Sequence, residues 1–177
     1  AIAGSNMVVL RTRSSGTKEI SMEGEGLSTV SEFTLRKGNT VAFTLMNSSS
    51  LETVHEDMDA TEALAITAKY WEDWAHRNNY GGDYGGAVER SLMTLKAMTY
   101  RHTGGIVAAL TTSRPEKSGG KRNWDYRYCW LRDTAFTLLV LIHAGYTEEA
   151  VAWRQWLLRA VAGAPDQIQT IYSIYGE

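Results

Sequence analysis

Cysteine and histidine are scarce in this chain of 177 residues. The single cysteine, Cys129, excludes an internal disulfide. The four histidines are scattered along the sequence and show none of the paired spacing that is typical of metal ligands. We therefore expect neither a metal site nor a cofactor.

The chain also lacks long apolar runs and an excess of charge of one sign. No apolar run reaches the length of about 18 residues that a membrane span needs. The net charge of −2 lacks the basic excess that is typical of nucleic-acid-binding proteins. The first residues, "AIAGSNMVVLRTR", do not follow the pattern of a secretory signal. We expect a cytoplasmic location without membrane or nucleic-acid partners. The hydrophobic content of 44% and charged content of 21% are those of a globular protein.

Residues 1–50 are predicted to form β-structure. In residues 33–46, apolar and polar residues alternate around Lys37-Gly38-Asn39, which predicts an antiparallel hairpin. "MVVLRTR" at 7–13 predicts an earlier strand, whereas 14–19 and 22–28 are predicted as loops. Two or three strands cannot bury a face by themselves, so we expect this part to belong to a larger β domain.

From Asp59 onward the apolar period changes from two to about 3.6, which predicts helices. Asp59 is a candidate N-cap, with Glu62 at the spacing of a capping box. Gly145 is suited to end a helix, and Thr147 to begin the next one. The predicted helices span residues 59–78, 87–100, 131–144 and 148–162.

Aromatic and charged residues are concentrated just before the third of these helices. Aromatics occupy every second position, at Trp124, Tyr126, Tyr128 and Trp130. On an extended segment they would share one side. A core-packing ladder would account for the rings, but charges are rarely buried without partners. The interspersed charges are Arg122, Asp125, Arg127, Arg132 and Asp133.

Two interpretations of these charges remain open, a polar ligand pocket and a structural ion-pair network, because perturbed charges occur at both. Sugars suit the first interpretation. Their C–H faces pack on aromatic rings, and their hydroxyl groups form hydrogen bonds with Arg and Asp side chains.

The stretch "NWDYRYCWLRDTAF" resembles the signature of the glucoamylase/trehalase family of inverting glycoside hydrolases, glycoside hydrolase family 15, in its bacterial form. Residues 90–100, 103–116 and 145–158 resemble consecutive segments of bacterial members in the same order. Leu110 and the pair Arg101-His102 depart from the proline-containing sequence that is usual there, which alters the expected stiffness of the loop.

The resemblance implies an α+β chain with three parts. Residues 1–50 would be the last strands of an N-terminal β-sandwich domain, since 32–45 resembles those strands in relatives. Residues 51–86 would form a linker helix region. Residues 87–177 would be the first part of an (α/α)₆ catalytic barrel, so that the chain is a fragment of a longer enzyme.

The resemblance also implies substrate-binding residues for an oligosaccharide. In relatives, the Arg-Asp pair that matches Arg132 and Asp133 binds hydroxyls of the non-reducing terminal glucose. The residues that match Tyr126 and Trp130 help to line the same subsite. Cys129 is expected to pack behind it as a small apolar residue, and Asp125, Tyr128 and Arg122 to buttress it.

An inverting mechanism needs two carboxylates about 6.5–9.5 Å apart, one as general acid and one as general base. In the family both lie downstream of the matched segments, so we expect the catalytic pair beyond Glu177 and no activity from this chain by itself. Glu177 resembles a loop residue that precedes the acid. The remaining candidates, Glu116, Glu148 and Glu149, are expected to be loop or helix N-terminal charges.

Three functions remain open. The leading hypothesis is release of glucose from the non-reducing ends of malto- or isomalto-oligosaccharides by the parent enzyme, and trehalase activity is its rival. The third is a non-catalytic carbohydrate-binding fragment. A barrel cut after four helices would expose apolar faces, so we also expect oligomers or poor solubility.

Overall fold

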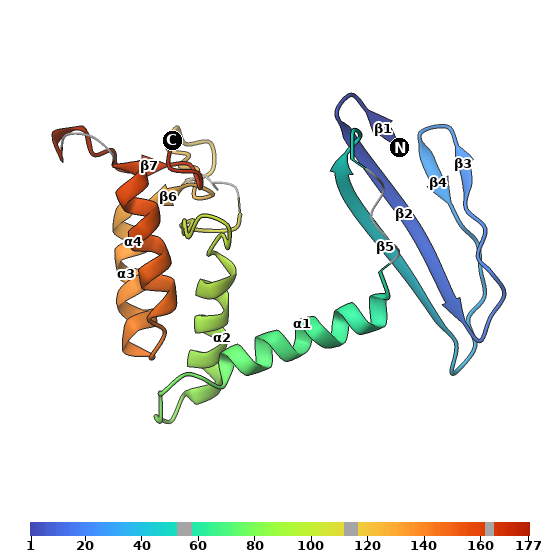
Figure 1. The fold of residues 1–177 in the computed structure, drawn as a ribbon, viewed down its shortest axis with the longest axis horizontal. Helices are drawn as coiled ribbons and strands as arrows, with labels where there is room; N and C mark the ends of the chain where they lie inside the picture. The colour runs from blue at the N-terminus through green and yellow to red at the C-terminus, as the bar shows by residue number, and fades with distance from the viewer. Residues whose placement is uncertain (53–57, 112–116, 162–164) are drawn as a thin grey trace. The chain divides into compact units, whose positions relative to one another are not determined.

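The computed structural model describes residues 1–52, 58–111, 117–161 and 165–177. The chain divides into two compact units, residues 1–70 and 71–177. Within the described residues the first unit is rich in strands and the second in helices, so the chain is α+β, as predicted (Figure 1).

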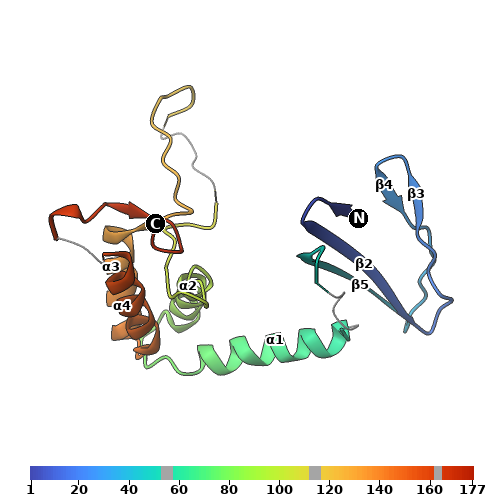
Figure 2. The same cartoon turned by 45° about the horizontal axis from the view of Figure 1, so that its top comes forward.

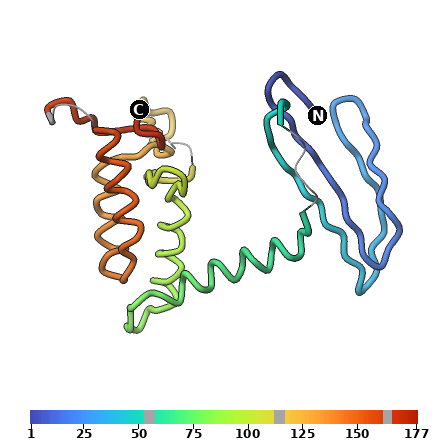
Figure 3. The backbone as a smooth tube through the Cα atoms, viewed as in Figure 1, coloured from blue at the N-terminus to red at the C-terminus, as the bar shows by residue number. Residues whose placement is uncertain are grey.

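The β unit is built on one long antiparallel pair, in which β2 (Asn6–Ser15) and β5 (Thr40–Ser49) match along their whole length (Figure 3). The short β1 (Ile2–Ala3) pairs with the other edge of β2, which gives the order β1-β2-β5. A separate hairpin joins β3 (Glu23–Glu25) to β4 (Ser28–Val30).

The predicted hairpin over residues 33–46 is wrong. Its turn is present, because the N–H of Asn39 donates to the carbonyl of Arg36 over 2.9 Å. However, residues 31–36 form no strand, and β5 takes β2 as its partner. The rings of Phe33 and Phe43 still lie 5.7 Å apart between centroids. A period of two identifies a strand and its faces but does not identify its partner.

The predicted loop at 22–28 is also partly wrong, because it contains β3 and the beginning of β4. All residues of these two strands are exposed. An exposed hairpin has no buried face, so it carries no apolar alternation from which it could be recognised.

All four predicted helices are confirmed, with ends within three residues of those predicted. The oxygen Oδ1 of Asp59 accepts hydrogen bonds from the backbone N–H groups of Thr61 and Glu62 at 2.9 and 3.1 Å, as expected of an N-cap. Thr147 stands at the N-cap position of the last helix, although its side chain makes no capping hydrogen bond. The helices are α1 (Ala60–Ala75), α2 (Gly85–Ala97), α3 (Leu131–His143) and α4 (Glu148–Ala160).

Gly145 ends α3 as predicted, with a φ of 96° that an L-residue rarely adopts. The next N–H, that of Tyr146, donates to the carbonyl of Leu141 over 2.9 Å, which closes a Schellman motif. This reversal allows α4 to run back beside α3, as both views of the helical unit show (Figures 1 and 2).

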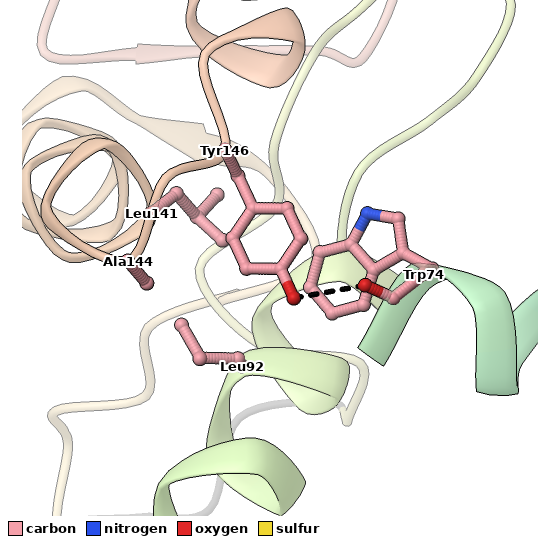
Figure 4. Close-up of a cluster of buried hydrophobic side chains, with 5 residues drawn as sticks. All are labelled: Trp74, Leu92, Leu141, Ala144 and Tyr146. Atoms are coloured by element: carbon pink, nitrogen blue, oxygen red, sulfur yellow. Dashed lines mark hydrogen bonds between the residues drawn. The ribbon is translucent and has the colours of Figure 1, made fainter. Parts of the chain in front are cut away.

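The core of the helical unit gathers side chains from the end of α1, from α2 and from the end of α3 (Figure 4). The rings of Trp74 and Tyr146 stack at 4.0 Å between centroids. The Tyr146 hydroxyl donates to the carbonyl of Trp74 over 2.9 Å. Leu92, Leu141 and Ala144 complete this buried cluster. Burial of each large side chain stabilises the unit by about 1.5–3 kcal/mol.

No helix among the described residues has both the length and the apolar character that a membrane crossing requires.

Candidate functional site

Three segments of the helical unit meet at the start of α3. The strand β6 (Cys129–Trp130) pairs antiparallel with β7 (Ile171–Tyr172). In the sequence, β7 follows the 3₁₀-helix η1 (Pro165–Gln167). On the other side, the N–H groups of Ala108 and Ala109 donate to the carbonyls of Tyr128 and Tyr126, at 3.0 and 2.8 Å. These bonds fix the backbone just before α3.

Behind this backbone lies a second buried cluster, formed by Cys129, Trp156 and Tyr172. Cys129 is fully buried, and burial raises the pKa of its thiol to about 11. The residue therefore packs as a small neutral side chain, as the sequence predicted.

The aromatic row is not extended throughout, so its four rings do not share one side in the predicted way. A turn at residues 126–127 interrupts it, and only β6 is a strand. Three of the rings gather as a result: the Trp130 ring lies 5.8 Å from that of Tyr126, stacked, and 6.3 Å from that of Trp124, edge to face. Tyr128 is exposed.

The side chain of Asp125 stabilises the turn at residues 126–127 through hydrogen bonds. Its carboxylate accepts hydrogen bonds from the backbone N–H and the guanidinium of Arg127, and its carbonyl accepts one from Nε1 of Trp130 at 3.0 Å. The hydrogen bonds from Arg127, side chain first and then backbone, lower the pKa of Asp125. These contacts show that Asp125 braces the turn and Trp130, and its expected role as a buttress of a sugar subsite stays a prediction.

Arg132 and Asp133 stand in the first turn of α3, immediately after Trp130, which is its N-cap residue. Nη2 of Arg132 lies 3.1 Å from Oδ2 of Asp133, and the two side chains are 70% and 31% exposed. Much of the guanidinium therefore faces solvent and keeps N–H donors for another partner.

Thr134 was missed by the sequence reasoning. It is buried, and its hydroxyl donates to the carbonyl of Trp130 over 2.9 Å, with the carbonyl of Ile106 3.3 Å from the same oxygen. The bond to the fourth preceding residue ties Trp130 to α3. The available signal was a threonine in the first turn of the helix, directly before a mostly apolar run.

The structure thus brings Tyr126 and Trp130 together as a ring pair, and Arg132 and Asp133 together as an ion pair. None of the four is among the described residues that line two mostly apolar hollows of the helical unit, of about 420 and 260 Å³. We place the candidate site at the surface formed by the ring pair and the ion pair rather than in these hollows, because sugar hydroxyls need hydrogen-bonding partners.

The other acidic candidates lie in different surroundings. Glu148 is exposed and pairs with Arg77 at 3.2 Å, whereas Glu149 is buried and pairs with Lys96 at 2.8 Å. The carbonyl of Glu177 accepts from the N–H of Ser173. Glu116 lies outside the described residues. Among the residues that are described, no group of three or more His, Cys, Asp or Glu is placed to hold a metal ion.

Comparison with known proteins shows what this segment is similar to. The family model "Glycosyl hydrolases family 15" matches residues 82–177, which include the whole ring and ion-pair region. The trehalase of Thermoplasma acidophilum is 45% identical over 111 residues, 63% of this chain and 19% of that protein. No solved structure matches the chain.

More distant relatives carry the same name. A trehalase of Mycobacterium tuberculosis is 36% identical over 124 residues, 67% of this chain and 18% of its own length. "Trehalase 1" of Sulfolobus acidocaldarius is 31% identical over 119 residues, 67% of this chain and 20% of its own. The chain spans about a fifth of the length of these relatives.

Proposed function

The chain belongs to glycosyl hydrolases family 15, and from this membership we propose that it is part of an enzyme that hydrolyses trehalose. The observation that carries the proposal is the match to trehalases from archaea and mycobacteria. Its segment from Trp124 to Thr134 would supply one wall of the sugar site. The leading hypothesis from the sequence, release of glucose from malto- or isomalto-oligosaccharides, becomes the second candidate.

The proposed wall has two chemical parts. The stacked rings of Tyr126 and Trp130 offer an apolar surface for the C–H face of a glucose ring. Arg132 and Asp133 offer charged donors and acceptors for its hydroxyls. Both trehalose and maltose end in an α-linked glucose, so this wall suits either sugar, which is why the second candidate is kept.

The chemistry itself requires a general acid and a general base on opposite sides of the bond. We propose that residues beyond this chain provide both, and that the described segment binds and orients the terminal glucose. Clamping the sugar in this way raises the effective concentration of the reacting groups. No catalytic role is assigned to Glu177.

We further propose that the helical unit is the beginning of an (α/α)₆ barrel and the strands of 1–50 the end of a β-sandwich, with residues 51–86 as the linker region. Exposed apolar side chains on α3 and α4 support this reading, because helices of a complete barrel would cover them. They include Phe136, Leu139, Val140, Val151 and Leu158.

The test uses the full-length protein that contains this segment, with trehalose and maltose as separate substrates. NMR of the first products identifies the anomers, because hydrolysis of trehalose with inversion at one anomeric carbon releases one β-glucose and one α-glucose. Faster turnover of trehalose supports the trehalase proposal, and faster turnover of maltose replaces it with the second candidate. Binding without turnover of either sugar would indicate a non-catalytic carbohydrate-binding protein.

A further inference from the structure

We propose that Asp125 and Arg127 form a positioning pair, which holds the indole of Trp130 in the orientation that receives the sugar ring. The inference rests on the proposed function, since it concerns the same wall. Neither residue is assigned a contact with the sugar. Both act through the turn between Trp124 and Trp130.

The side chain of Asp125 closes the turn. Its Oδ1 accepts from the backbone N–H of Arg127 at 3.0 Å and from Nε of Arg127 at 3.0 Å. Its Oδ2 accepts from Nη2 at 2.7 Å. A forked pair of this kind fixes the direction of both side chains as well as their separation. The backbone from 125 to 127 is therefore held in one conformation.

The turn is connected to the indole of Trp130 by a hydrogen bond and a ring contact. The carbonyl of Asp125 accepts from Nε1 of Trp130 at 3.0 Å, and Tyr126, inside the turn, stacks on the same indole. A rotation of the peptide at 125–126 would break the hydrogen bond and displace the stacked ring together. The N–H of Ala109, bound to the carbonyl of Tyr126, limits the turn from the other side. The orientation of Trp130 thus depends on the conformation that Asp125 and Arg127 maintain.

The ion pair of Asp125 and Arg127 contributes more to the order of Trp130 than to the stability of the fold. The side chains of Asp125 and Arg127 are 33% and 56% exposed, and exposed ion pairs contribute little to stability. The indole of Trp130 is half-buried and retains a surface for a ligand. A pair that adds little to folding but orders a binding ring lowers the ordering cost at the moment of binding. The role of the Asp125–Arg127 pair is therefore in substrate binding rather than in the stability of the fold.

The test measures KM and kcat of the full-length enzyme for trehalose and maltose. Asp125→Ala and Arg127→Gln should each raise KM by about 3- to 10-fold, the order expected when one large side chain loses its pre-ordering. The value of kcat should change less than about twofold, because ring stacking acts on the bound substrate and the transition state alike. The KM of the double variant should be no higher than that of either single variant, since each single substitution already removes the Asp125–Arg127 ion pair.

Two further variants sharpen the test. Arg127→Lys keeps the charge but lacks the fork, so it should behave like Arg127→Gln if geometry is what matters. Arg13→Gln is the matched control: it also removes an arginine from an exposed pair, with Asp59 at 2.9 Å in the β unit. Its KM should equal that of the wild type.

A spectroscopic readout keeps the inference testable without activity. The difference in near-UV circular dichroism between the wild type and Trp130→Phe defines the contribution of the Trp130 ring. Asp125→Ala should lose most of that contribution with an unchanged far-UV spectrum. If the wild type cleaves neither sugar, the proposed function fails, while a lost Trp130 signal still shows that the pair positions the ring. Unchanged KM and an unchanged Trp130 signal in an active enzyme would overturn the inference, and so would a KM change that merely follows loss of the far-UV signal.

Discussion

Nε1 of Trp74 donates a hydrogen bond of 3.0 Å to Oε1 of Glu149, a carboxylate whose side chain is 1% exposed. The same oxygen lies 2.8 Å from Nζ of Lys96 and 4.0 Å from Nη2 of Arg77. Oε2 is buried and has no hydrogen-bond partner within the described part of the chain. One carboxylate thus joins the last turn of α1, the last turn of α2 and the first turn of α4.

Glu149→Gln should destabilise the helical unit. The change leaves Lys96 without its anion, and removal of one partner from a largely buried pair costs about 2–4 kcal/mol. The adjacent Glu148→Gln is the control, because Glu148 is exposed and pairs only at the surface, with an expected cost below about 1 kcal/mol. Urea unfolding of the full-length protein measures both. Equal losses for the two variants would show that the buried network does not stabilise the fold.

Stability should fall with acid in a way that depends on Glu149. Desolvation raises the pKa of Glu149, but the hydrogen bonds from Lys96 and Trp74 outweigh it, so the pKa is lowered overall. A lowered folded-state pKa adds stability above the unfolded value, about 4.3, and that stability is lost as pH falls through the folded pKa. The Tm difference between wild type and Glu149→Gln should therefore shrink below about pH 4. A constant difference down to pH 3 would contradict the assignment.

The burial of Glu149 could not be predicted from the sequence. An acidic residue in the first turn of a helix interacts favourably with the helix dipole, so its sequence position indicated a helix N-terminal charge and gave no sign of burial. Its burial depends on Trp74, 75 residues earlier, and on Lys96. The helices themselves were predictable because their signals, caps and a 3.6-residue period, lie within each segment.

Strand pairing and the turn at the site were harder to predict for the same reason. The partner of Thr40 in the ladder is Ser15, and no local pattern distinguishes that pairing from a hairpin with residues 33–36. At the site, the alternation of aromatics from 124 to 130 indicated an extended segment. The carboxylate of Asp125 overrode it by closing a turn, a local competition that asparagine and aspartate often win.

Gly104 should be irreplaceable, whereas Gly119 should tolerate substitution better. Both have positive φ, 85° and 75°, so an alanine costs about 1–2 kcal/mol at either. At Gly104 the added Cβ would also lie 2.5 Å from the carbonyl oxygen of Ala152 on α4, whereas at Gly119 no atom of the described residues lies within 4 Å. Overpacking against backbone costs about 1–3 kcal/mol more.

Thermal melts of Gly104→Ala and Gly119→Ala measure this difference directly. The matched backbone strain cancels between the two variants, so the excess loss in Gly104→Ala reports the close approach to α4. Equal melting temperatures would mean that the segment around Gly104 moves away from α4 at little cost.

The 177-residue chain by itself should associate in solution. Phe136, Leu139 and Val140 are exposed on α3, and apolar patches of this kind drive association. Size-exclusion chromatography with light scattering should show oligomers or aggregates. Phe136→Lys combined with Leu139→Lys should reduce them. A monodisperse monomer with a cooperative thermal transition would count against the proposed truncated barrel.

Asp133→Asn in the full-length enzyme should lower kcat/KM for its α-glucoside by at least ~30-fold. If Asp133 and Arg132 bind glucose hydroxyls, deletion of one charged partner in the enclosed complex costs about 2–5 kcal/mol, and 2 kcal/mol corresponds to roughly that factor. The loss should appear largely in kcat, because the sugar flattens toward an oxocarbenium ion while its periphery stays clamped. Asparagine has nearly the same shape, and the partner of Asp133 in the ion pair, Arg132, is 70% exposed, so Tm should hardly change. Kinetics and melts of the same variant separate the two interpretations of these charges. A lowered Tm with normal kcat/KM would make them a structural ion pair and remove both residues from the site.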